Sequence, residues 1–561
     1  MTGVALAERP WLRFYEPGVP PTLTYPSIPV HALLDDTAAR FPDRPATVFF
    51  GATLTFRQLQ DLSIRFAAGL AALGVRPGDR VSLHLPNCPQ FLIAYYGALR
   101  VGAVVVPFNP LYVEREIEHQ LTDSGAEVAV TLDLLYPRLE AVRSRTRVRE
   151  MVITRIHDYF PPLLRALYPL RAWREGHRVR VPAGPAIRRF ADLLEAGRPA
   201  PAVAVDPAQT AVLLYTGGTT GVPKGAMLSH RNLVSNVLQA RAWFTRLRPG
   251  QDTTLAVIPF FHSYGMTAAM NFSVSTGTRL VLLPRFQVDM VLQAIARYRP
   301  QIFPGVPTIY TALISHPQVR RYDLRSISAC ISGAAPLPVE VQTRFEELTG
   351  GRLVEGYGLT EASPVTHANP LFGTRKTGSI GIPFPDTDAR ILDDAGRTLP
   401  PGEVGELAVR GPQVMQGYWN RPDETAQVLR EGWLLTGDMA RMDEDGYFYI
   451  VDRKKEMIIT GGLNVFPREV EEVLYTHPAV LEAAVVGTPD PYKGEVVKAF
   501  VVLRPGARAT AEEIIEHCRR HLAPFKVPRA VEFRPQLPKS LIGKILRRVL
   551  AEEERARAQA R

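Results

Sequence analysis

Residues 215–225 read YTGGTTGVPKG and combine four glycines with three threonines and one lysine. Glycine weakens the interior of a helix or strand, because ordering it costs more conformational entropy than ordering any other residue. The stretch is therefore predicted to be a loop. It follows the apolar run AVLLY (211–215), which is typical of a buried strand, and precedes Ser229, which can cap a helix over residues 232–244.

A glycine-rich loop between a strand and a helix favours a phosphate-binding site. Close-set glycines let backbone N–H groups converge on an anion. The hydroxyls of Thr216, Thr219 and Thr220 add donors, and Lys224 adds a mobile positive charge. The common nucleoside-triphosphate pattern GxxxxGK[ST] does not fit, because Pro223 precedes the lysine. A solvent-exposed Gly/Thr turn would explain the same residues, so the loop alone decides nothing.

The chain is too long for one hydrophobic core. It has 561 residues, and single cores stop growing at roughly 250–300 residues, so we expect at least two domains. Cys88, Cys330 and Cys518 are far apart and form no CxxC pair, which disfavours a disulfide framework or a structural zinc site. We find no signal-peptide pattern and no apolar stretch of membrane-spanning length. A cytoplasmic location is therefore predicted.

Positive charge is concentrated in one segment. The formal net charge is +10, and residues 141–190 carry twelve arginines against three acidic residues, a local charge of +9. The stretch YFPPLLRALYPLRAW (159–173) also mixes leucines and aromatics with arginine. This pattern favours peripheral docking on an anionic membrane, on the inner face, although a solvated surface insert would look the same. No nucleic-acid recognition motif accompanies the charge, so no nucleic-acid partner is expected.

Strand-like and helix-like runs alternate through the first 430 residues, for example RLVLLP (279–284) and VDMVLQAIARY (288–298). Such alternation predicts an α/β fold with largely parallel sheets. Near residue 400 a β-rich stretch with PPG and DAG turns begins, and a compact α+β unit follows the charged VDRKKEM (451–457). We therefore predict a large multi-layer N-terminal domain with a small β region (1–451) and a small mobile α+β C-terminal domain (452–561).

Seven motifs now stand in order along the chain. They are YTGGTTGVPKGAMLSH (215–230), PFFHSYGM (259–266), ISGAAPLP (331–338), VEGYGLTEASP (354–364), GWLLTGDMA (432–440), DRKKEMIITGGLNVFPREVE (452–471) and LPKSLIGKILRR (537–548). This ordered set resembles the adenylate-forming superfamily of acyl-CoA synthetases, luciferases and peptide-synthetase adenylation domains. Residues 84–112 and 115–128 are similar to the bacterial long-chain fatty-acid–CoA ligases within it.

The resemblance implies an AMP-forming acid–thiol ligase of lipid metabolism. A fatty acid, medium- to long-chain, would react with ATP and Mg²⁺ to give an acyl-adenylate, and coenzyme A would then displace AMP. A ligase for short-chain or aromatic acids, a luciferase-like oxygenase, a peptide-synthetase module and a non-catalytic nucleotide- or membrane-binding scaffold are the alternatives. The sequence leaves open the chain length, the pathway and whether the protein forms a homodimer.

The resemblance also assigns residues to ATP and its phosphates. Lys544 would bridge the carboxylate and the α-phosphate, Lys224 would stabilise the leaving pyrophosphate, Thr360 would bind phosphate, and Glu361 would hold Mg²⁺. The full ATP- and AMP-binding set is Thr216, Gly217, Gly218, Thr219, Thr220, Gly221, Lys224, Gly333, Ala334, Ala335, Gly356, Tyr357, Gly358, Thr360, Asp438, Arg453 and Lys544.

Two further groups concern the other substrates. The acyl pocket is expected around Trp243, His262 and Gly305, with His262 at its entrance. Asp452 resembles the hinge about which the C-terminal domain rotates between the half-reactions. The hinge and coenzyme A group is Asp452, Gly461, Gly462 and Asn464.

Overall fold

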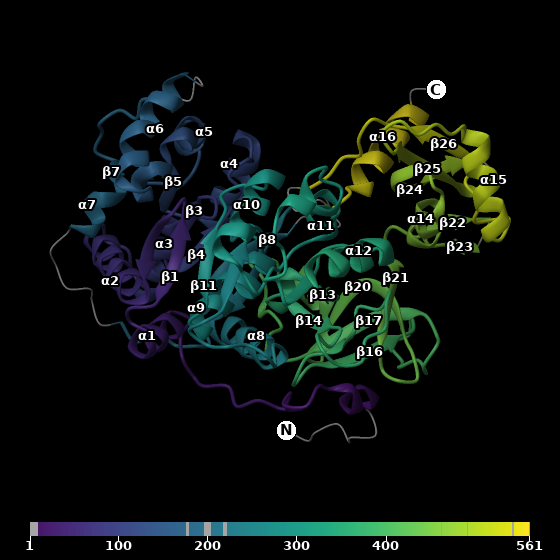
Figure 1. Cartoon of the computed structure of the whole chain (residues 1–561), viewed down its shortest axis with the longest axis horizontal. Coiled ribbons are helices and arrows are strands. Elements are labelled where there is room, and N and C mark those ends of the chain that lie inside the picture. Colours follow the sequence, from purple (N-terminus) through teal and green to yellow (C-terminus); the bar gives the residue numbers. More distant parts are fainter. Residues whose placement is uncertain are drawn as a thin grey trace. The chain divides into compact units, whose positions relative to one another are not determined.

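A computed structural model describes residues 9–174, 179–195, 203–216, 222–461, 463–490, 492–540 and 544–559. The chain divides into two compact units (Figure 1). The large unit comprises Trp11–Asp388 and Arg410–Leu434, and the small unit comprises Met1–Pro10, Ala389–Val409 and Leu435–Arg561. The fold is the α/β arrangement that the sequence predicts, with both sheets and helices in each unit.

The large unit is built on an eight-stranded sheet with the order β18-β9-β8-β4-β3-β5-β6-β7. From β8 to β7 neighbouring strands run parallel, whereas β9 and β18 join antiparallel at one edge. The strands are β3 (Arg80–His84), β4 (Val104–Pro107), β5 (Val128–Leu132), β6 (Glu150–Thr154), β7 (Ile187–Arg189), β8 (Thr210–Thr216), β9 (Lys224–Ser229) and β18 (Gly417–Tyr418).

The stretch that opened the sequence analysis forms a hairpin. β8 continues to Thr216 and β9 begins at Lys224, with Thr216 paired to Lys224 across the two strands. The prediction of a loop running to residue 225 was wrong at its C-terminal end, because Lys224 and Gly225 lie in a strand that the glycine content concealed. The predicted helix cap is confirmed: the Ser229 side chain accepts the backbone N–H of Asn232 at the start of α8 (His230–Trp243).

Two smaller sheets complete the large unit. One has the order β10-β11-β1-β2 and the other β12-β13-β14-β15. The first contains β1 (Pro45–Phe49), β2 (Ala52–Thr55), β10 (Thr253–Ala256) and β11 (Arg279–Leu282). The second contains β12 (Ala329–Ser332), β13 (Arg352–Gly358), β14 (Val365–Ala368) and β15 (Ile382–Pro383). β12 and β13 are parallel, as are β10 and β11, so most sheet pairs of this unit follow the predicted direction.

Helices accompany these sheets in the order that the alternating pattern predicts. They are α1 (His31–Arg40), α2 (Phe56–Ala72), α3 (Pro89–Arg100), α4 (Glu114–Ser124), α5 (Tyr136–Arg143), α6 (Pro162–Arg174), α7 (Phe190–Leu194), α8, α9 (Phe272–Thr276), α10 (Val288–Tyr298), α11 (Pro307–Ile314), α12 (Val339–Thr349) and α13 (Pro422–Val428). α10 coincides with the run predicted from its periodicity, and its Val291, Leu292 and Ile295 are buried.

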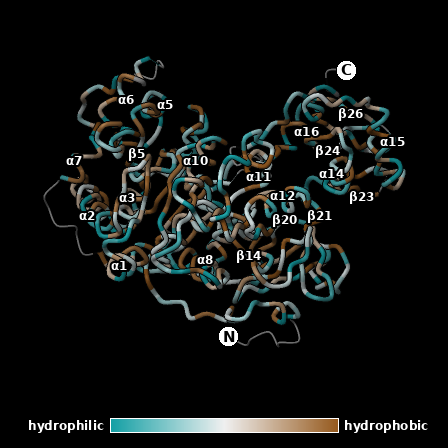
Figure 2. Tube along the Cα trace, viewed as in Figure 1, coloured by the Kyte–Doolittle hydropathy of each residue, from teal (hydrophilic) through white to brown (hydrophobic). Residues whose placement is uncertain are grey.

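Parallel strands are hydrophobic on both faces when layers cover both sides of a sheet. All residues of β5 are buried, and Figure 2 shows it as a hydrophobic run. β24 of the small unit also appears in Figure 2 as largely hydrophobic. Across the residues described, no helix has the length and apolar character needed to cross a bilayer.

The small unit carries two sheets and three helices. One sheet includes β16 (Asp388–Leu392), β17 (Gly405–Arg410), β20 (Trp433–Met442) and β21 (Phe448–Arg453). The other has the order β23-β22-β25-β24, with β26 on β25, and contains β22 (Ile458–Thr460), β23 (Leu463–Val465), β24 (Val480–Asp490), β25 (Gly494–Leu503) and β26 (Ala530–Phe533). The helices are α14 (Pro467–Thr476), α15 (Ala511–His521) and α16 (Arg547–Gln559). The boundary at residue 452 stays a prediction, and Asp452 itself lies within β21.

One backbone position of the large unit admits only glycine. Gly381 has φ +87°, and a Cβ there would lie 2.0 Å from the backbone carbon of Ala368. Gly378 has a similar φ of +81°, but a Cβ there would meet nothing within 4 Å. We expect Gly378→Ala to lower the free energy of unfolding by about 1–2 kcal/mol, through φ strain alone. Gly381→Ala should lower it by about 3 kcal/mol or more, because the backbone must also move. Urea unfolding of the two variants tests this, and equal losses would contradict it.

Candidate active site

Lys224 lies at the start of β9 and is held by an acidic and an aromatic side chain. Its ammonium forms an ion pair with Glu424 of α13, and it lies 5.3 Å from the ring centroid of Tyr418. The Lys224 side chain is only 11 % exposed. A partly buried ammonium is stabilised by a carboxylate and by the electron-rich face of an aromatic ring. The position of this lysine is thus fixed by packing.

Glu361 reaches the same tyrosine. It lies in the short 3-10 helix η7 (Thr360–Ala362), and the Tyr418 hydroxyl donates a 2.8 Å hydrogen bond to its Oε1. The backbone carbonyl of Glu361 accepts the N–H of Met415 at 2.7 Å. The neighbouring Thr360 hydroxyl lies 3.3 Å from that of Ser263. Lys224 and Glu361, both predicted phosphate-site residues, therefore contact the same side chain, that of Tyr418.

The partly buried carboxylate of Asp123 links the end of β8 to the segment that follows β18. Asp123 accepts hydrogen bonds from the Tyr215 hydroxyl at 2.7 Å, from Arg421 at 2.9 Å and, through its backbone carbonyl, from Trp419 Nε1 at 3.1 Å. Burial raises the pKa of Tyr215 far above its usual value, and the hydrogen bond to Asp123 adds to the effect. Tyr215 lies near the end of β8, so this contact fixes the position of that end of the strand.

Sequence reasoning missed Tyr418 and Glu424. Both lie in GYWNRPDE (417–424), where two aromatic, two acidic and one basic side chains stand within eight residues. That density was the only available signal, because the contact depends on β18 lying beside β9, with Tyr418 opposite Ala226. Strand order of this kind is not visible in a local pattern.

The predicted adenine slot lies where two parallel strands end. β12 and β13 are paired in parallel with Ser332 opposite Glu355, so Gly333 to Ala335 follow β12 beside the last residues of β13, which include Tyr357. Ala334 adopts φ +66°, a strained conformation for a residue with a Cβ and one often found at functional sites. A Cβ on Gly356 would come within 2.7 Å of the Ile331 side chain, so the close packing there requires glycine.

Gly305 of the predicted acyl pocket adjoins this slot. Its carbonyl accepts the N–H of Gly333 at 3.1 Å, and it forms a parallel bridge with Ser332. Tyr264, which sequence reasoning did not single out, lies beside Gly333 and donates a 2.5 Å hydrogen bond to the Ile331 carbonyl.

His262 is close to the same region, since its ring Nδ1 accepts the Tyr264 N–H at 3.2 Å. It lies three residues before the π-helical segment η5 (Gly265–Asn271), and such segments are frequent at functional sites. Trp243 has different neighbours. Trp243 is buried, and its ring packs edge-to-face with Tyr15 and at a tilt with Phe384. Its indole N–H donates to the Asn369 carbonyl at 3.2 Å. These are the contacts of a residue that packs in the core.

The small unit brings together three predicted ATP-binding residues. Asp438 on β20 pairs in register with Arg453 on β21, and Arg453 Nε lies 3.0 Å from its carboxylate. Lys544 faces the same pair. The nearby Arg453 guanidinium and burial lower the pKa of Lys544 to about 8, against the opposing pull of Asp438 and Glu456. A basic pair around one carboxylate is suited to an anionic ligand that carries hydroxyls and phosphate.

The predicted hinge residue is tied to the segment that carries Lys544. Asp452 is buried and accepts the backbone N–H groups of Arg453 and Arg468, each at 2.7 Å. Arg547 donates to Asp452 at 2.8 Å and to Glu456 at 2.7 Å, and it also pairs with Glu471. Because Arg547 is three residues after Lys544, this network fixes Lys544 relative to β21.

The remaining predicted residues lie on a hairpin or outside the described residues. Gly461 connects β22 to β23 and donates its N–H to the Lys493 carbonyl at 2.8 Å, and Asn464 pairs with Ile459. Six predicted residues fall outside the described ranges: Gly217, Gly218, Thr219, Thr220, Gly221 and Gly462.

The oxygen donors around Glu361 fit a magnesium ion. Mg²⁺ prefers hard oxygen ligands and commonly takes one or two carboxylates, with water and substrate phosphate in its other positions. Glu361 supplies one carboxylate beside the Thr360 hydroxyl. Within the described part of the chain, no three His, Cys, Asp or Glu side chains stand together so as to hold a metal ion. A magnesium ion here would therefore depend on the phosphates of a nucleotide.

The chain belongs to the AMP-binding enzyme family, whose main domain matches residues 34–419 and whose C-terminal domain matches residues 469–544.

Full-length relatives narrow the comparison. A long-chain-fatty-acid–CoA ligase of Bacillus subtilis is 50% identical over 552 residues, which cover 98% of both chains. A long-chain-fatty-acid–CoA ligase of Yersinia pestis is 43% identical, again over 98% of each chain. The crystal structure of the anthranilate CoA ligase AuaEII with anthranoyl-AMP superposes with a TM-score of 0.84 at 28% identity, covering 96% of this chain and 99% of that one.

Tyr418→Phe removes the hydroxyl that holds Glu361 and keeps the ring beneath Lys224. We expect the KM for Mg-ATP to rise several-fold, because a hydrogen bond to a charged group contributes about 1.5–3 kcal/mol. Tyr25→Phe is the matched control, since Tyr25 also donates to a carboxylate, Asp386, at 2.7 Å in the same unit. It should lower stability similarly and leave the KM unchanged. ATP–pyrophosphate exchange measures the KM of each variant. Equal KM shifts in the two variants would show that Tyr418 acts only on stability.

Proposed function

We propose that this protein is an ATP-dependent ligase that joins a fatty acid to coenzyme A and releases AMP and pyrophosphate. The observation that carries the proposal is the convergence of Lys224 and Glu361 on Tyr418, which provides a cation and a magnesium ligand for phosphate. Full-length similarity to two ligases of this name supports the choice of substrates.

The first half-reaction brings a carboxylate to the α-phosphorus of ATP, so positive charge must be concentrated where two anions meet. Lys544 orients the carboxylate and the α-phosphate. Lys224 and Thr360 stabilise the charge that develops on pyrophosphate. Glu361 holds Mg²⁺, which neutralises phosphate charge when bound. Asp438 accepts the ribose hydroxyls, and Arg453 binds ribose or phosphate.

In the second half-reaction the sulfur of coenzyme A attacks the acyl carbonyl and the C–O bond to AMP breaks. Lys544 has no role in this step, so we propose that the C-terminal domain, residues 452–561, rotates about Asp452. The hairpin from Gly461 to Asn464 would then face the pantetheine arm. The hydrogen bonds from Arg547 to Asp452 and Glu456 support a coupling between the hinge and the Lys544 segment. A rotation about Asp452 would either distort these hydrogen bonds or move the Lys544 segment together with them.

A second substrate class has an observation in its favour. The structural similarity to an anthranilate CoA ligase extends over 96% of this chain, so an aromatic acid is the alternative to a fatty acid. Gly305 and Tyr264 adjoin the adenine slot, and the volume beyond them sets which acid fits. Peripheral contact of residues 141–190 with an anionic membrane belongs to the same proposal, because long-chain acids partition into bilayers. Cytoplasmic location and homodimer formation stay predictions.

AMP formation from ATP and Mg²⁺ tests the proposal, with acids from acetate to oleate and with benzoate or anthranilate, each with and without coenzyme A. We expect a coenzyme-A-dependent signal that is largest with long chains. A maximum with aromatic acids would select the second substrate class. Adenylate formation that coenzyme A does not change would point to another acceptor, and no turnover with any acid would overturn the proposal.

The hinge role of Asp452 is tested by two substitutions. Asp452→Ala removes the carboxylate that Arg547 and two backbone N–H groups contact, and it should weaken both half-reactions together. Asp452→Pro also restricts φ, so we expect an additional loss in thioester formation, of about tenfold or more, that adenylation does not share. ATP–pyrophosphate exchange reports adenylation, and coenzyme-A-dependent AMP release reports the full cycle. Equal losses in both assays for the two variants would exclude a hinge role.

The lowered pKa of Lys544 predicts how adenylation depends on pH. In the free enzyme Lys544 loses its charge as pH rises through about 8, so kcat/KM for ATP in pyrophosphate exchange should fall there. Arg453→Gln removes the largest cause of the lowered pKa and should move the fall to higher pH, even if the maximal rate drops. The unfolded chain binds more protons between about 8 and 10.5, so this lysine's contribution to stability rises with pH across that window. An unmoved pH profile in Arg453→Gln would contradict the assignment.

A further inference from the structure

Helix α6 presents large apolar side chains to solvent. Leu163 is 74% exposed, Leu167 51%, Leu170 62% and Trp173 64%. Leu163, Leu167 and Leu170 stand at i, i+4 and i+7, so they form one stripe along the helix. Figure 2 shows both hydrophobic and hydrophilic residues along α6.

The protein's own core does little to stabilise this helix. Tyr168 is half-buried and packs with its ring 5.2 Å from Phe160 and 5.1 Å from His157, on the helix η4 (Ile156–Tyr159) and the residue after it. By the helical repeat Tyr168 and Arg165 project away from the leucine stripe. A helix of this length is marginal in water without a packed apolar face, and Pro169 inside it removes one backbone hydrogen bond. The stripe therefore needs an apolar partner.

The structure revises the charge argument for residues 141–190. Five of their arginines are neutralised by carboxylates: Arg143 by Glu140, Arg145 by Glu118, Arg149 by Glu127, Arg188 by Glu150 and Arg189 by Asp192. The charge that this segment offers to a partner is therefore smaller than the excess counted from the sequence. Arg165 and Arg174 of α6 form no ion pair among the described residues, so unpaired positive charge remains on the helix that carries the stripe.

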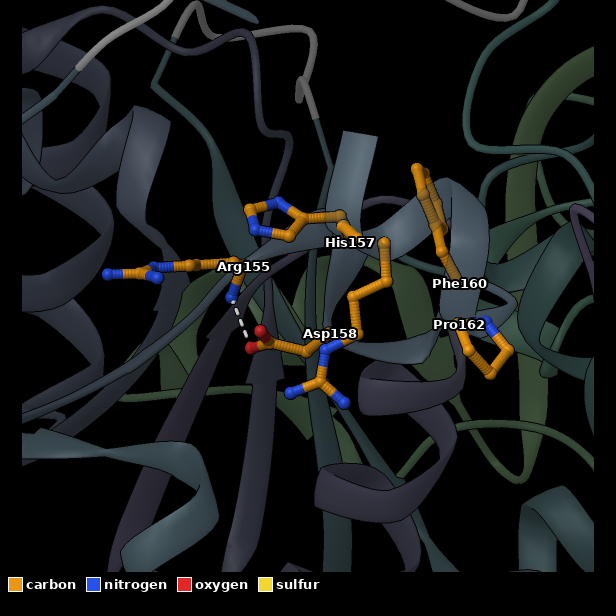
Figure 3. A pocket seen from close by; sticks show the side chains of 7 residues that line it. Arg155, His157, Asp158, Phe160 and Pro162 are labelled. Atoms are coloured by element: carbon orange, nitrogen blue, oxygen red, sulfur yellow. Dashed lines mark hydrogen bonds between the residues drawn. The ribbon is translucent and has the colours of Figure 1, made fainter. Parts of the chain in front are cut away.

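A pocket of about 400 Å³ opens beside the start of α6. Arg155, His157, Phe160 and Arg165 contribute to its lining (Figure 3). Asp158 also lines it, but its carboxylate accepts the Arg155 backbone N–H at 2.8 Å and the Thr154 hydroxyl at 3.1 Å. Arg155 is 65% exposed, and its nearest carboxylate, Asp133, is 4.0 Å away. Figure 3 shows the Arg155 guanidinium directed away from His157, Asp158 and Phe160, so Arg165 is the lining guanidinium that an anion in the pocket would meet.

We propose that α6 is a membrane-docking helix whose leucine stripe inserts into a bilayer while the adjacent pocket receives the phosphate of an anionic phospholipid. This rests on the proposed membrane contact of residues 141–190 and narrows it to one helix and one pocket. Apolar side chains flanked by arginines are the combination that binds an interface containing anionic lipid. Arg165 projects from the side of α6 opposite the leucines, which is the side where lipid headgroups surround a helix that lies in the interface.

Vesicle sedimentation of the full chain, without ATP or coenzyme A, tests this. Phosphatidylglycerol–phosphatidylcholine vesicles should bind the protein and release it as salt rises, and pure phosphatidylcholine should bind it weakly. The triple variant Leu163→Ser, Leu167→Ser and Leu170→Ser should lose about 100-fold in affinity, since three leucines no longer leave water. Leu111→Ser, which changes a 61% exposed leucine elsewhere in the large unit, is the control and should bind normally.

A second pair of variants addresses the pocket. Arg165→Gln should reduce binding to phosphatidylglycerol vesicles several-fold, whereas Arg147→Gln, at a residue that does not line the pocket, should not. Brominated lipid should quench the emission of Trp173, and Trp173→Phe should abolish most of that quenching. This signal reports insertion directly and does not depend on affinity.

Three outcomes would overturn the proposal. They are no binding to anionic vesicles, unchanged binding by the triple-serine variant, and loss of a dimer in that variant without loss of vesicle binding, which would make the stripe an interface between copies. The ligase reaction is measured separately with octanoate and no vesicles. The triple variant should keep that activity, so a failure of membrane docking is distinguishable from a failure of the ligase assignment.

Discussion

The pairing of β18 with β9 is the contact on which the arrangement of the predicted phosphate-binding residues of the large unit depends. It places Tyr418 beside the strand that begins at Lys224, so one aromatic ring contacts the lysine while its hydroxyl holds Glu361. These residues are separated by long stretches of chain, and only the strand order of the sheet makes them neighbours. The hydrogen bonds to Asp123 then hold the end of β8, at Tyr215, and the residue after β18, Trp419.

Much of the fold follows from patterns that act over short distances. The period of α10, the cap at Ser229 and the alternation of strands and helices are local, and the structure confirms them. β9 was missed because its strand character depends on pairing with β8, which overrides the weak propensity of its glycine. Tyr418 and Glu424 could not be placed, since sheet order is a long-range property. The arginines of residues 141–190 showed an excess of charge in sequence, whereas four of the five carboxylates that pair with them come from outside the segment.

The small unit uses a comparable principle with different chemistry. Asp438 and Arg453 face each other across two antiparallel strands, and Asp452, next along β21, binds Arg547 near the far end of the chain. Buried ion pairs of this kind contribute less to net stability than to fixing one geometry. A change at Asp452 therefore reaches Lys544 through three residues of backbone, without any direct contact between the two side chains.

The ion pair between Lys224 and Glu424 sets a minimum charge for any anion that binds at the predicted phosphate site. A ligand that approaches Lys224 competes with a carboxylate already in place, so its own charge must exceed what that carboxylate supplies. A singly charged anion gains little by the exchange, whereas a polyphosphate with its magnesium ion offers several contacts at once. If Lys224 binds phosphate as predicted, the Glu424 carboxylate would make the site discriminate by valence and would lower its occupancy by the abundant small anions of a cell.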